Sequence, residues 1–297
     1  MALSTVNVGT TANDGTGDPL RTAFQTVNTA ITAINNGEVA SRRNQLLNGA
    51  FTVWQKGASD FPDTWISVGT SGTTPTPTRE SHTIGQTDVP GGGEHYFRWK
   101  AAGTSSGQPI IGTGIEDVRT LANRASVLSF YARADVSRTL QVRITQSFGS
   151  GGSSFAIGGI TSFSVTTAWT KFSVALTPTT ISGKTVGAGS YLGLRFYGVN
   201  GVTDQHFDFD LIQWELGATA TPFEHRGFAV ERLLCSRYYQ TKTVRSENGA
   251  RHIPLLPMRA VPTMAVGVGT AGNVTVDGFE LTHTTAADCT VTASAEL

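Results

Sequence analysis

Two kinds of hydrophobic pattern divide the chain. Near the N-terminus, apolar residues recur at alternating spacings of four and three, at Leu20, Phe24, Val27, Ile31 and Ile34. This spacing predicts an amphipathic helix with a narrow, coiled-coil-like seam. From residue 95 onwards, apolar and polar residues alternate instead, which is the period of β-strands that bury one face.

The helix is expected to begin at Asp18 and to end before Gly37. Asp18 is a favourable N-cap, Pro19 stands where a missing N–H costs little, and Gly37 suits the left-handed end of a helix. A single helix of about 18 residues with so narrow a seam is marginal in water. It therefore packs either on its own domain or against copies of itself, in a short bundle on a symmetry axis.

The residues before this helix favour the bundle. Residues 9–17 are mostly Gly, Asn, Asp and Thr, and they offer few apolar side chains for burial. Such a segment is expected to become ordered on a partner. We therefore predict an attachment arm and an oligomerisation helix over residues 1–43.

Six segments alternate strongly enough to be predicted as strands. They cover residues 95–101, 127–133, 139–148, 169–176, 191–199 and 207–215. Loop-rich connections join them and no long helical pattern intervenes, so an antiparallel sandwich is expected. A further strand is expected to begin at Phe51 and Val53, whereas the Thr- and Pro-rich residues 67–93 are expected to form surface loops.

Composition narrows the function classes. The 297 residues include 22 basic and 22 acidic side chains, and this balance argues against nucleic-acid or membrane-surface binding. No run approaches the roughly 18 apolar residues of a membrane span, so no membrane insertion is expected, and no signal peptide is recognisable. Cys235 and Cys289 lack metal-ligand spacing and are expected to be free thiols.

Residues 227–297 are predicted to form a small C-terminal β-rich domain. Residues 228–239 have a helical pattern, with Val230, Leu233 and Leu234 apolar and Glu231 and Arg232 polar, and a β-like pattern begins near residue 263. A unit of about 70 residues without a disulfide has a marginal core. We therefore expect it to pack on the preceding domain or on its symmetry mates.

Residues 13–24, Asn-Asp-Gly-Thr-Gly-Asp-Pro-Leu-Arg-Thr-Ala-Phe, resemble a known family. They are similar to the N-terminal segment common in tail-fibre and related appendage proteins of tailed bacteriophages. The resemblance implies a homotrimer that is attached to the virion through its N-terminal segment. The residues assigned to attachment are Asn13, Asp14, Gly15, Thr16 and Gly17.

Two further stretches resemble the two ends of one β domain. Residues 44–51 (NQLLNGAF) are similar to the opening strand of carbohydrate-binding-module jelly rolls, and residues 207–217 (FDFDLIQWELG) to the closing strand. Residues 221–226, 234–239 and 258–263 resemble segments of phage structural proteins. The resemblance implies a closed jelly roll over residues 44–226. The expected fold class is thus mainly β, an antiparallel jelly-roll sandwich between the N-terminal arm and helix and the C-terminal β unit.

The closing stretch carries two aspartates and differs from these modules in one respect. Strict alternation places Phe207, Phe209 and Leu211 on one face and Asp208, Asp210 and Ile212 on the other. The modules often hold a structural calcium with an acidic residue after the Asn-Gly pair, where this chain has Ala50. Because calcium takes six or more oxygens, we predict no metal site and expect both aspartates to face water; a calcium site is the alternative.

No catalytic residue and no cofactor are predicted, and the chain is not expected to be an enzyme. It contains no GxSxG, HExxH, Walker or CxxC motif, and its six histidines are scattered. Asp208 and Asp210 share one face of their strand, and nothing in the pattern indicates a raised pKa for either.

Binding to glycans has more support. Aromatic rings stack on the C–H face of a sugar, and planar donors bond its hydroxyls. Residues of this kind alternate with the apolar set at Tyr131, Arg133, Gln141, Arg143, Arg195 and Tyr197. An ordinary solvated sheet face or a subunit contact is the alternative interpretation. The tryptophans are expected mainly in the core or at interfaces.

Together these observations predict a trimeric structural component of a bacteriophage virion. Its partners would be its own copies, other virion proteins of the tail, collar or head, and a polysaccharide of the host surface. One alternative is a head decoration or collar protein without glycan binding. The other is an enzyme, or an accessory module, that acts on polysaccharide.

Overall fold

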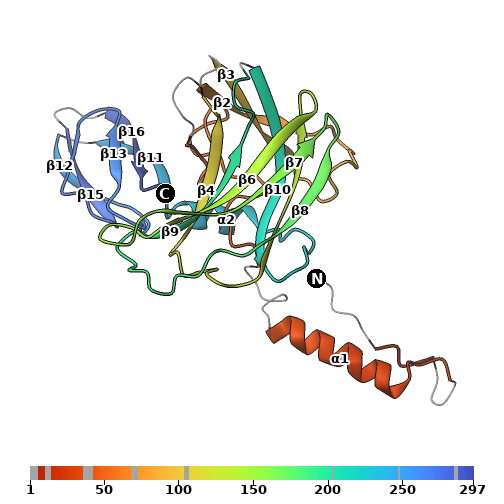
Figure 1. The fold of residues 1–297 in the computed structure, drawn as a ribbon. Helices are drawn as coiled ribbons and strands as arrows, with labels where there is room; N and C mark the ends of the chain where they lie inside the picture. Colours follow the sequence, from red (N-terminus) through yellow and green to blue (C-terminus); the bar gives the residue numbers. More distant parts are fainter. Residues whose placement is uncertain are drawn as a thin grey trace.

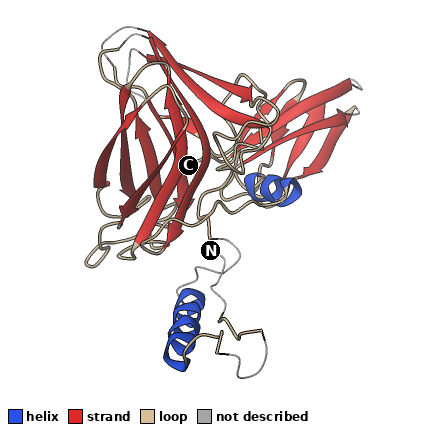
Figure 2. Cartoon of the chain, turned by 90° about the vertical axis from the view of Figure 1, so that its right-hand side faces the viewer, coloured by secondary structure: helices blue, strands red, loops and turns tan. Residues whose placement is uncertain are grey.

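The computed structural model describes residues 6–10, 15–35, 43–68, 73–103, 107–202, 204–246, 248–283 and 287–297. Most of the regular secondary structure in these residues consists of antiparallel strands (Figures 1 and 2). Neither of the helices in the described residues, α1 (Leu20–Asn35) and α2 (Phe228–Cys235), is long and apolar enough to cross a membrane.

Ten strands form two five-stranded sheets that face each other. Sheet I has the order β1 (Ile66–Ser67), β4 (Ile110–Glu116), β9 (Tyr191–Tyr197), β6 (Arg138–Ser147), β7 (Ala156–Val165). Sheet II has the order β2 (Thr73–Ser81), β3 (His95–Gly103), β10 (Asp204–Leu216), β5 (Ser126–Ala134), β8 (Thr170–Leu176). The antiparallel pairs β3–β10, β4–β9, β5–β8 and β6–β7 are nested in the chain, which defines a jelly roll.

The six predicted strands all occur, and the sequence missed others for identifiable reasons. In β4 and β7, glycines interrupt the alternation of apolar and polar side chains that would have indicated a strand. They are Gly112, Gly114, Gly158 and Gly159. The prediction of loops throughout residues 67–93 was wrong, because β2 is a nine-residue strand that contains Pro75 and Pro77. β2 lies at the edge of sheet II, where a strand tolerates residues that lack an N–H.

The expected strand at Phe51 and Val53 was also wrong. Residues 43–57 form bends and turns, and Asn48 and Phe51 have φ angles of 54° and 51°. Single hydrogen bonds hold this segment beside β10, from the Gln45 N–H to the Trp214 carbonyl and from the Ile212 N–H to the Gly49 carbonyl. A Cβ at Gly49 would overlap the Ile212 carbonyl oxygen, so this close approach requires glycine.

A β-bulge interrupts the alternation of β10. The register against β5 shifts between Asp210 and Gln213, and Leu211 has a φ of 49°. Ile212 therefore lies in the core cluster, on the side of Phe207 and Phe209, which corrects its predicted position beside the aspartates. The bulge also turns Trp214 into the core.

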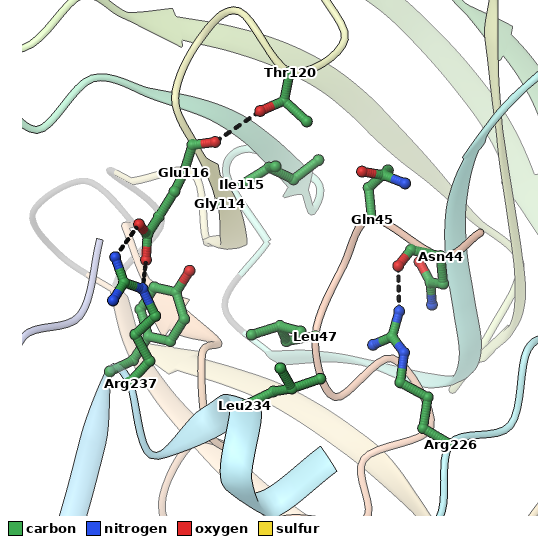
Figure 3. Close-up of a pocket in the computed structure, with 11 residues that line it drawn as sticks. Asn44, Gln45, Leu47, Gly114, Ile115, Glu116, Thr120, Arg226, Leu234 and Arg237 are labelled. Atoms are coloured by element: carbon green, nitrogen blue, oxygen red, sulfur yellow. Dashed lines mark hydrogen bonds and ion pairs between the residues drawn. The ribbon is translucent and has the colours of Figure 1, made fainter. Parts of the chain in front are cut away.

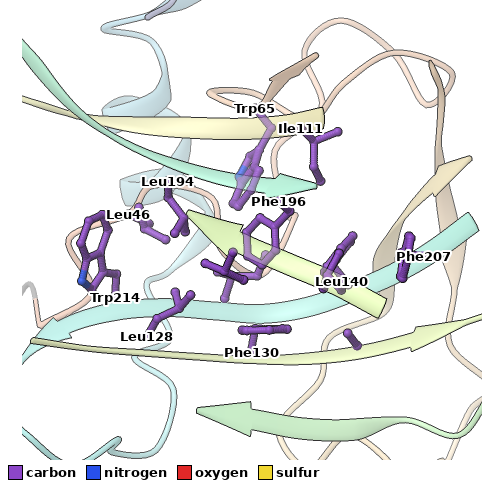
Figure 4. Packing of buried hydrophobic residues seen from close by; sticks show 14 of the residues in the cluster. Leu46, Trp65, Ile111, Leu128, Phe130, Leu140, Leu194, Phe196, Phe207 and Trp214 are labelled. Atoms are coloured by element: carbon purple, nitrogen blue, oxygen red, sulfur yellow. The ribbon is translucent and has the colours of Figure 1, made fainter. Parts of the chain in front are cut away.

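Aromatic rings fill the space between the sheets (Figure 4). Phe130 and Phe196 meet edge to face with ring centroids 5.3 Å apart, and Phe196 lies 5.1 Å from Phe209. Trp65 and Trp99 are also buried in this cluster. The inward faces of β3 to β10 thus supply a continuous apolar core.

The C-terminal residues form a smaller unit with its own apolar cluster, which includes Ile253, Phe279, Leu281 and Val291. One of its sheets has the order β11 (Tyr239–Ser246), β16 (Ala287–Ser294), β13 (Thr263–Val266). The other has the order β12 (Gly249–Pro254), β15 (Gly278–His283), β14 (Thr270–Gly272). Both cysteines are buried and free, as predicted.

Ion pairs join this unit to the jelly roll of the same chain. The Lys56 Nζ lies 2.7 Å from a carboxylate oxygen of Glu296, and the Arg237 Nε lies 2.7 Å from one of Glu116. The Leu297 side chain lies against Gly114 of β4. The unit therefore packs on the preceding domain, one of the two arrangements expected.

α1 lies apart from the two β-rich units (Figure 1), and three residues of its predicted seam are exposed. The exposed fractions of Leu20, Phe24 and Val27 are 74%, 60% and 41%. Ile31 and Ile34 also belong to α1, but their side chains are not part of what the structure describes. In the loop before the helix, the Asp18 carboxylate accepts the Asn7 N–H at 2.9 Å, so Asp18 closes that loop.

Phe209→Ala is expected to lower the free energy of unfolding by about 3–5 kcal/mol, because it empties a ring-sized volume in the core. Phe155→Ala is the matched control, since Phe155 is 56% exposed and its loss should change stability by less than about 0.5 kcal/mol. Urea denaturation of both variants measures the difference. Equal effects would mean that the aromatic cluster does not carry the stability of the jelly roll.

Candidate functional site

The residues proposed for glycan binding lie on two separate surfaces. Tyr131 and Arg133 lie on β5 in sheet II, whereas Gln141 and Arg143 lie on β6 in sheet I. Arg195 and Tyr197 lie on β9, also in sheet I. All six side chains alternate with core residues, so each group projects from the outer face of its own sheet.

On the outer face of sheet II, Arg133 is part of a closed ionic network. The Asp208 carboxylate accepts the Arg98 Nε at 2.7 Å and the Arg133 Nε at 2.8 Å. The Tyr96 hydroxyl lies within hydrogen-bond distance of both guanidinium groups. Asp208 is fully buried beneath these groups, so the expectation that it faces water was wrong.

Asp210 is buried in the same face and does not face water either. Its Oδ2 lies 2.9 Å from the His82 Nε2, and the His82 ring packs against Tyr96 and Trp169. Burial raises the pKa of Asp210, against the opposing effect of the His82 hydrogen bond. The described residues contain no group of three or more His, Cys, Asp or Glu side chains that could hold a metal ion.

Tyr131 lies farther along β5 and is only partly exposed. The Lys171 ammonium lies 6.0 Å from its ring centroid, and burial raises the pKa of its hydroxyl. Because Asp208 already holds Arg133, the two residues predicted on sheet II do not form a joint set of free donors.

The other four predicted residues lie together on the outer face of sheet I. In the register of β6 and β9, Gln141 lies opposite Tyr197 and Arg143 lies opposite Arg195. The Arg143 guanidinium sits 4.0 Å from the Tyr197 ring centroid and donates a 2.8 Å hydrogen bond to the Gln141 Oε1. A ring and planar donors are thus held side by side.

Arg195 lies in a slot between two glycines. A Cβ at Gly112 would overlap the Arg195 side chain, and one at Gly193 would crowd its guanidinium, so these residues provide its space. Its Nη1 donates to the Thr113 carbonyl at 2.8 Å, and only 6% of the residue is exposed. Burial lowers the pKa of Arg195, against the opposing effect of Tyr191.

Exposed apolar side chains border this face on β7. Ile160 lies opposite Arg143 and Ile157 lies opposite Thr145, and each isoleucine is 55% exposed. Sequence reasoning missed these residues, and Tyr191 at the start of β9, because it did not recognise β7 and did not extend the site along β9. Ile157 and Ile160 could have indicated this strand, but Gly158 and Gly159 between them interrupt the apolar–polar alternation.

A separate pocket of about 370 Å³ lies where the C-terminal unit meets the jelly roll (Figure 3). Glu116 and Arg237 stand on one side of it, Asn44 and Arg226 on the other, and Leu47 and Leu234 between them. Hydrogen bonds from Arg237 and Tyr238 hold the pKa of Glu116 below its usual value, although burial alone would raise it. These polar groups are paired with one another.

Arg226 connects the beginning of the jelly-roll region, its end and α2. Its guanidinium donates to the carbonyls of Asn44 and Leu46 and lies 3.2 Å from Glu224 and 3.3 Å from Glu231. Glu231 is buried, although the helical pattern of α2 placed it on the polar face, and it also accepts the backbone N–H of Asn48. The bonds of Arg226 therefore fix the position of α2 against the beginning and the end of the jelly-roll region.

Comparison with known proteins finds similarity only among solved structures. The sequence matches no family model and no curated protein. The enzymatically active domain of tailspike protein 4 from bacteriophage CBA120 is 15% identical with a TM-score of 0.38; the match covers 59% of this chain and 22% of that one.

Carbohydrate-binding modules are also among the similar structures. A family 11 module from Clostridium thermocellum, in complex with a mixed-linked tetrasaccharide, is 15% identical with a TM-score of 0.36; the match covers 55% of this chain and 97% of that one. A module in complex with β-1,4-galactotriose is 11% identical with a TM-score of 0.33, covering 59% of this chain and 99% of that one.

Arg226→Gln is expected to lower the free energy of unfolding by about 3 kcal/mol, because it leaves the buried Glu231 without its cation. Arg237→Gln is the control: it breaks an ion pair whose side chains are 47% and 30% exposed, and should cost less than about 1 kcal/mol. Thermal or urea unfolding distinguishes them. Similar losses would show that Arg226 is no more important than a surface ion pair.

Proposed function

We propose that this chain is a trimeric structural subunit of a bacteriophage virion, an appendage that binds host-surface glycan through the outer face of sheet I. The observation that carries the glycan assignment is the grouping of Tyr197, Arg143 and Gln141 on one partly exposed face. Rings and planar donors at this spacing suit a sugar ring and its hydroxyls. The proposal assigns no catalytic role to the chain.

The geometry of α1 supports the trimer. Three seam residues that a monomer leaves in water, Leu20, Phe24 and Val27, would be buried between copies of the helix. The seam therefore remains available to partner helices.

The loop before α1 is the proposed virion-attachment segment. Asn7 closes it by donating to the Thr16 carbonyl at 2.8 Å and to the Asp18 carboxylate. Gly15 and Thr16 are exposed on this loop and Gly17 lies against Asn7, whereas Asn13 and Asp14 lie outside the described residues. Three linked copies would bind a virion partner at high effective concentration.

Phe24→Asp is expected to weaken both trimerisation and incorporation into particles, because it places a charge in the apolar seam. Thr29→Asp adds the same charge outside the seam and should leave the trimer intact. Light scattering of the full chain and the amount of protein in purified particles are the two measurements. A wild-type chain that is monomeric at micromolar concentration would contradict the trimer.

Deletion of residues 1–17 completes this test. It should preserve the trimer and abolish incorporation, because it removes the attachment loop and leaves the helix. Particles that retain normal amounts of the shortened protein would place attachment elsewhere in the chain.

Tyr197→Ala is expected to weaken glycan binding about tenfold, which corresponds to the loss of one ring contact. Tyr131→Ala on the outer face of sheet II is the matched control and should bind as the wild type does. An array of bacterial surface polysaccharides measures both variants. An equal loss in the two would assign no special role to sheet I, and hydrolysis of a bound polysaccharide would favour the enzyme alternative.

A further inference from the structure

The outer face of sheet I carries two arginines on neighbouring strands. Arg143 and Arg195 are directly opposite each other in the register of β6 and β9. Like charges at opposed positions of an antiparallel pair destabilise a sheet. The burial of Arg195 increases the repulsion between the two charges, because little water reaches its guanidinium to screen it.

No carboxylate compensates these charges in the part of the chain that the structure describes. Ion pairs neutralise other partly buried arginines of the jelly roll: Arg98 and Arg133 pair with Asp208, and Arg138 pairs with Asp135 at 2.5 Å. Arg143 and Arg195 have no such pair, and their described partners are neutral oxygens and aromatic rings. The face therefore has an excess of positive charge.

Two buried polar atoms on this face also lack hydrogen-bond partners among the described residues. They are the Nε of Arg143 and the Oγ1 of Thr145. Thr145 lies opposite Gly193, and a Cβ there would meet both its hydroxyl and the Arg195 guanidinium. The Thr145 hydroxyl and the Arg195 guanidinium therefore lie near each other above Gly193, and Arg143 is the neighbouring outward-facing residue on β6.

We propose that the glycan bound on this face is acidic, and that its anionic group binds between Arg143, Arg195 and Thr145. A guanidinium presents parallel N–H groups that match the two oxygens of a carboxylate, and its bonds to an anion are stronger than those to a neutral hydroxyl. The anion would neutralise the like charges and satisfy the unpartnered donors. The inference rests on the proposed glycan function and names the class of sugar.

The neighbouring side chains suit the remainder of such a sugar. The Tyr197 ring lies on one side of the Arg143 guanidinium, and Ile160 lies opposite Arg143 on β7. These apolar surfaces can cover the C–H face of a pyranose while the arginines hold its acidic substituent. A uronate carboxylate and a phosphate ester share the required chemistry, and the experiment below distinguishes them.

The test compares an acidic sugar with its uncharged ester, and a carboxylate sugar with a phosphorylated one. Titration calorimetry of the full chain would use oligogalacturonate, its uncharged methyl ester, and a phosphorylated mannan oligosaccharide. The free acid is expected to bind at least about tenfold more tightly than the ester, as a charge-assisted bond predicts. Tighter binding of the phosphorylated sugar than of oligogalacturonate would assign the anion as phosphate and retain the acidic class.

Variants connect the charge preference to the named residues. Arg143→Gln should reduce binding of the acidic sugar about tenfold and abolish the preference over the ester. Thr145→Val removes an unpartnered hydroxyl, so it should leave thermal stability unchanged or higher while weakening acidic binding several-fold. Lys100→Gln removes an exposed charge from sheet II and is the control for net charge.

The failures of the two proposals are distinguishable. Equal affinity for acid and ester, or undiminished binding by Arg143→Gln, overturns the acidic-glycan inference and leaves glycan binding intact. Absence of binding to these sugars and to every polysaccharide of the array overturns both. If Lys100→Gln weakens binding as much as Arg143→Gln does, the effect depends only on the net charge of the protein, and the inference is also overturned.

Discussion

One buried guanidinium holds the entry of the jelly roll, its exit and the C-terminal unit in a single arrangement. Arg226 bonds the carbonyls of Asn44 and Leu46 at the entry, and pairs with Glu224 at the exit and Glu231 in α2. A desolvated cation is stable only when its acceptors surround it. The charge of Arg226 is therefore compensated only when all three segments are in place; Figure 3 shows the bond between Arg226 and Asn44.

The outer faces of the two sheets use the same residue types with opposite results. On sheet II, a buried aspartate neutralises two arginines, and aromatic rings cover them. On sheet I, two arginines face each other across adjacent strands without an acid among the described residues. Glycines at 112 and 193 make room for this arrangement by removing side chains from the neighbouring positions. The face with uncompensated charge is the one to which we assign ligand binding.

Much of the fold could be predicted because most strands bury one face, and burial of one face imposes strict alternation. The prediction was wrong or silent where another constraint governed the backbone. β2 contains prolines that only an edge strand tolerates, β4 and β7 have glycine where side chains would reveal the period, and β10 contains a bulge at Leu211. In α2, the pattern put Glu231 on the polar face, whereas a partner outside the helix, Arg226, allows its burial.

By itself, the sequence determined the class of fold, the positions of the main strands along the chain and the seam of the N-terminal helix, because these depend on local periodicity. It also identified Gln141, Arg143, Arg195 and Tyr197 as outward-facing side chains. Only the tertiary structure decided that these four lie together while Tyr131 and Arg133 lie on the other sheet, and that Asp208 neutralises Arg133. Such assignments depend on strand order and register, which bring together residues far apart in the chain, and local periodicity carries no information about either.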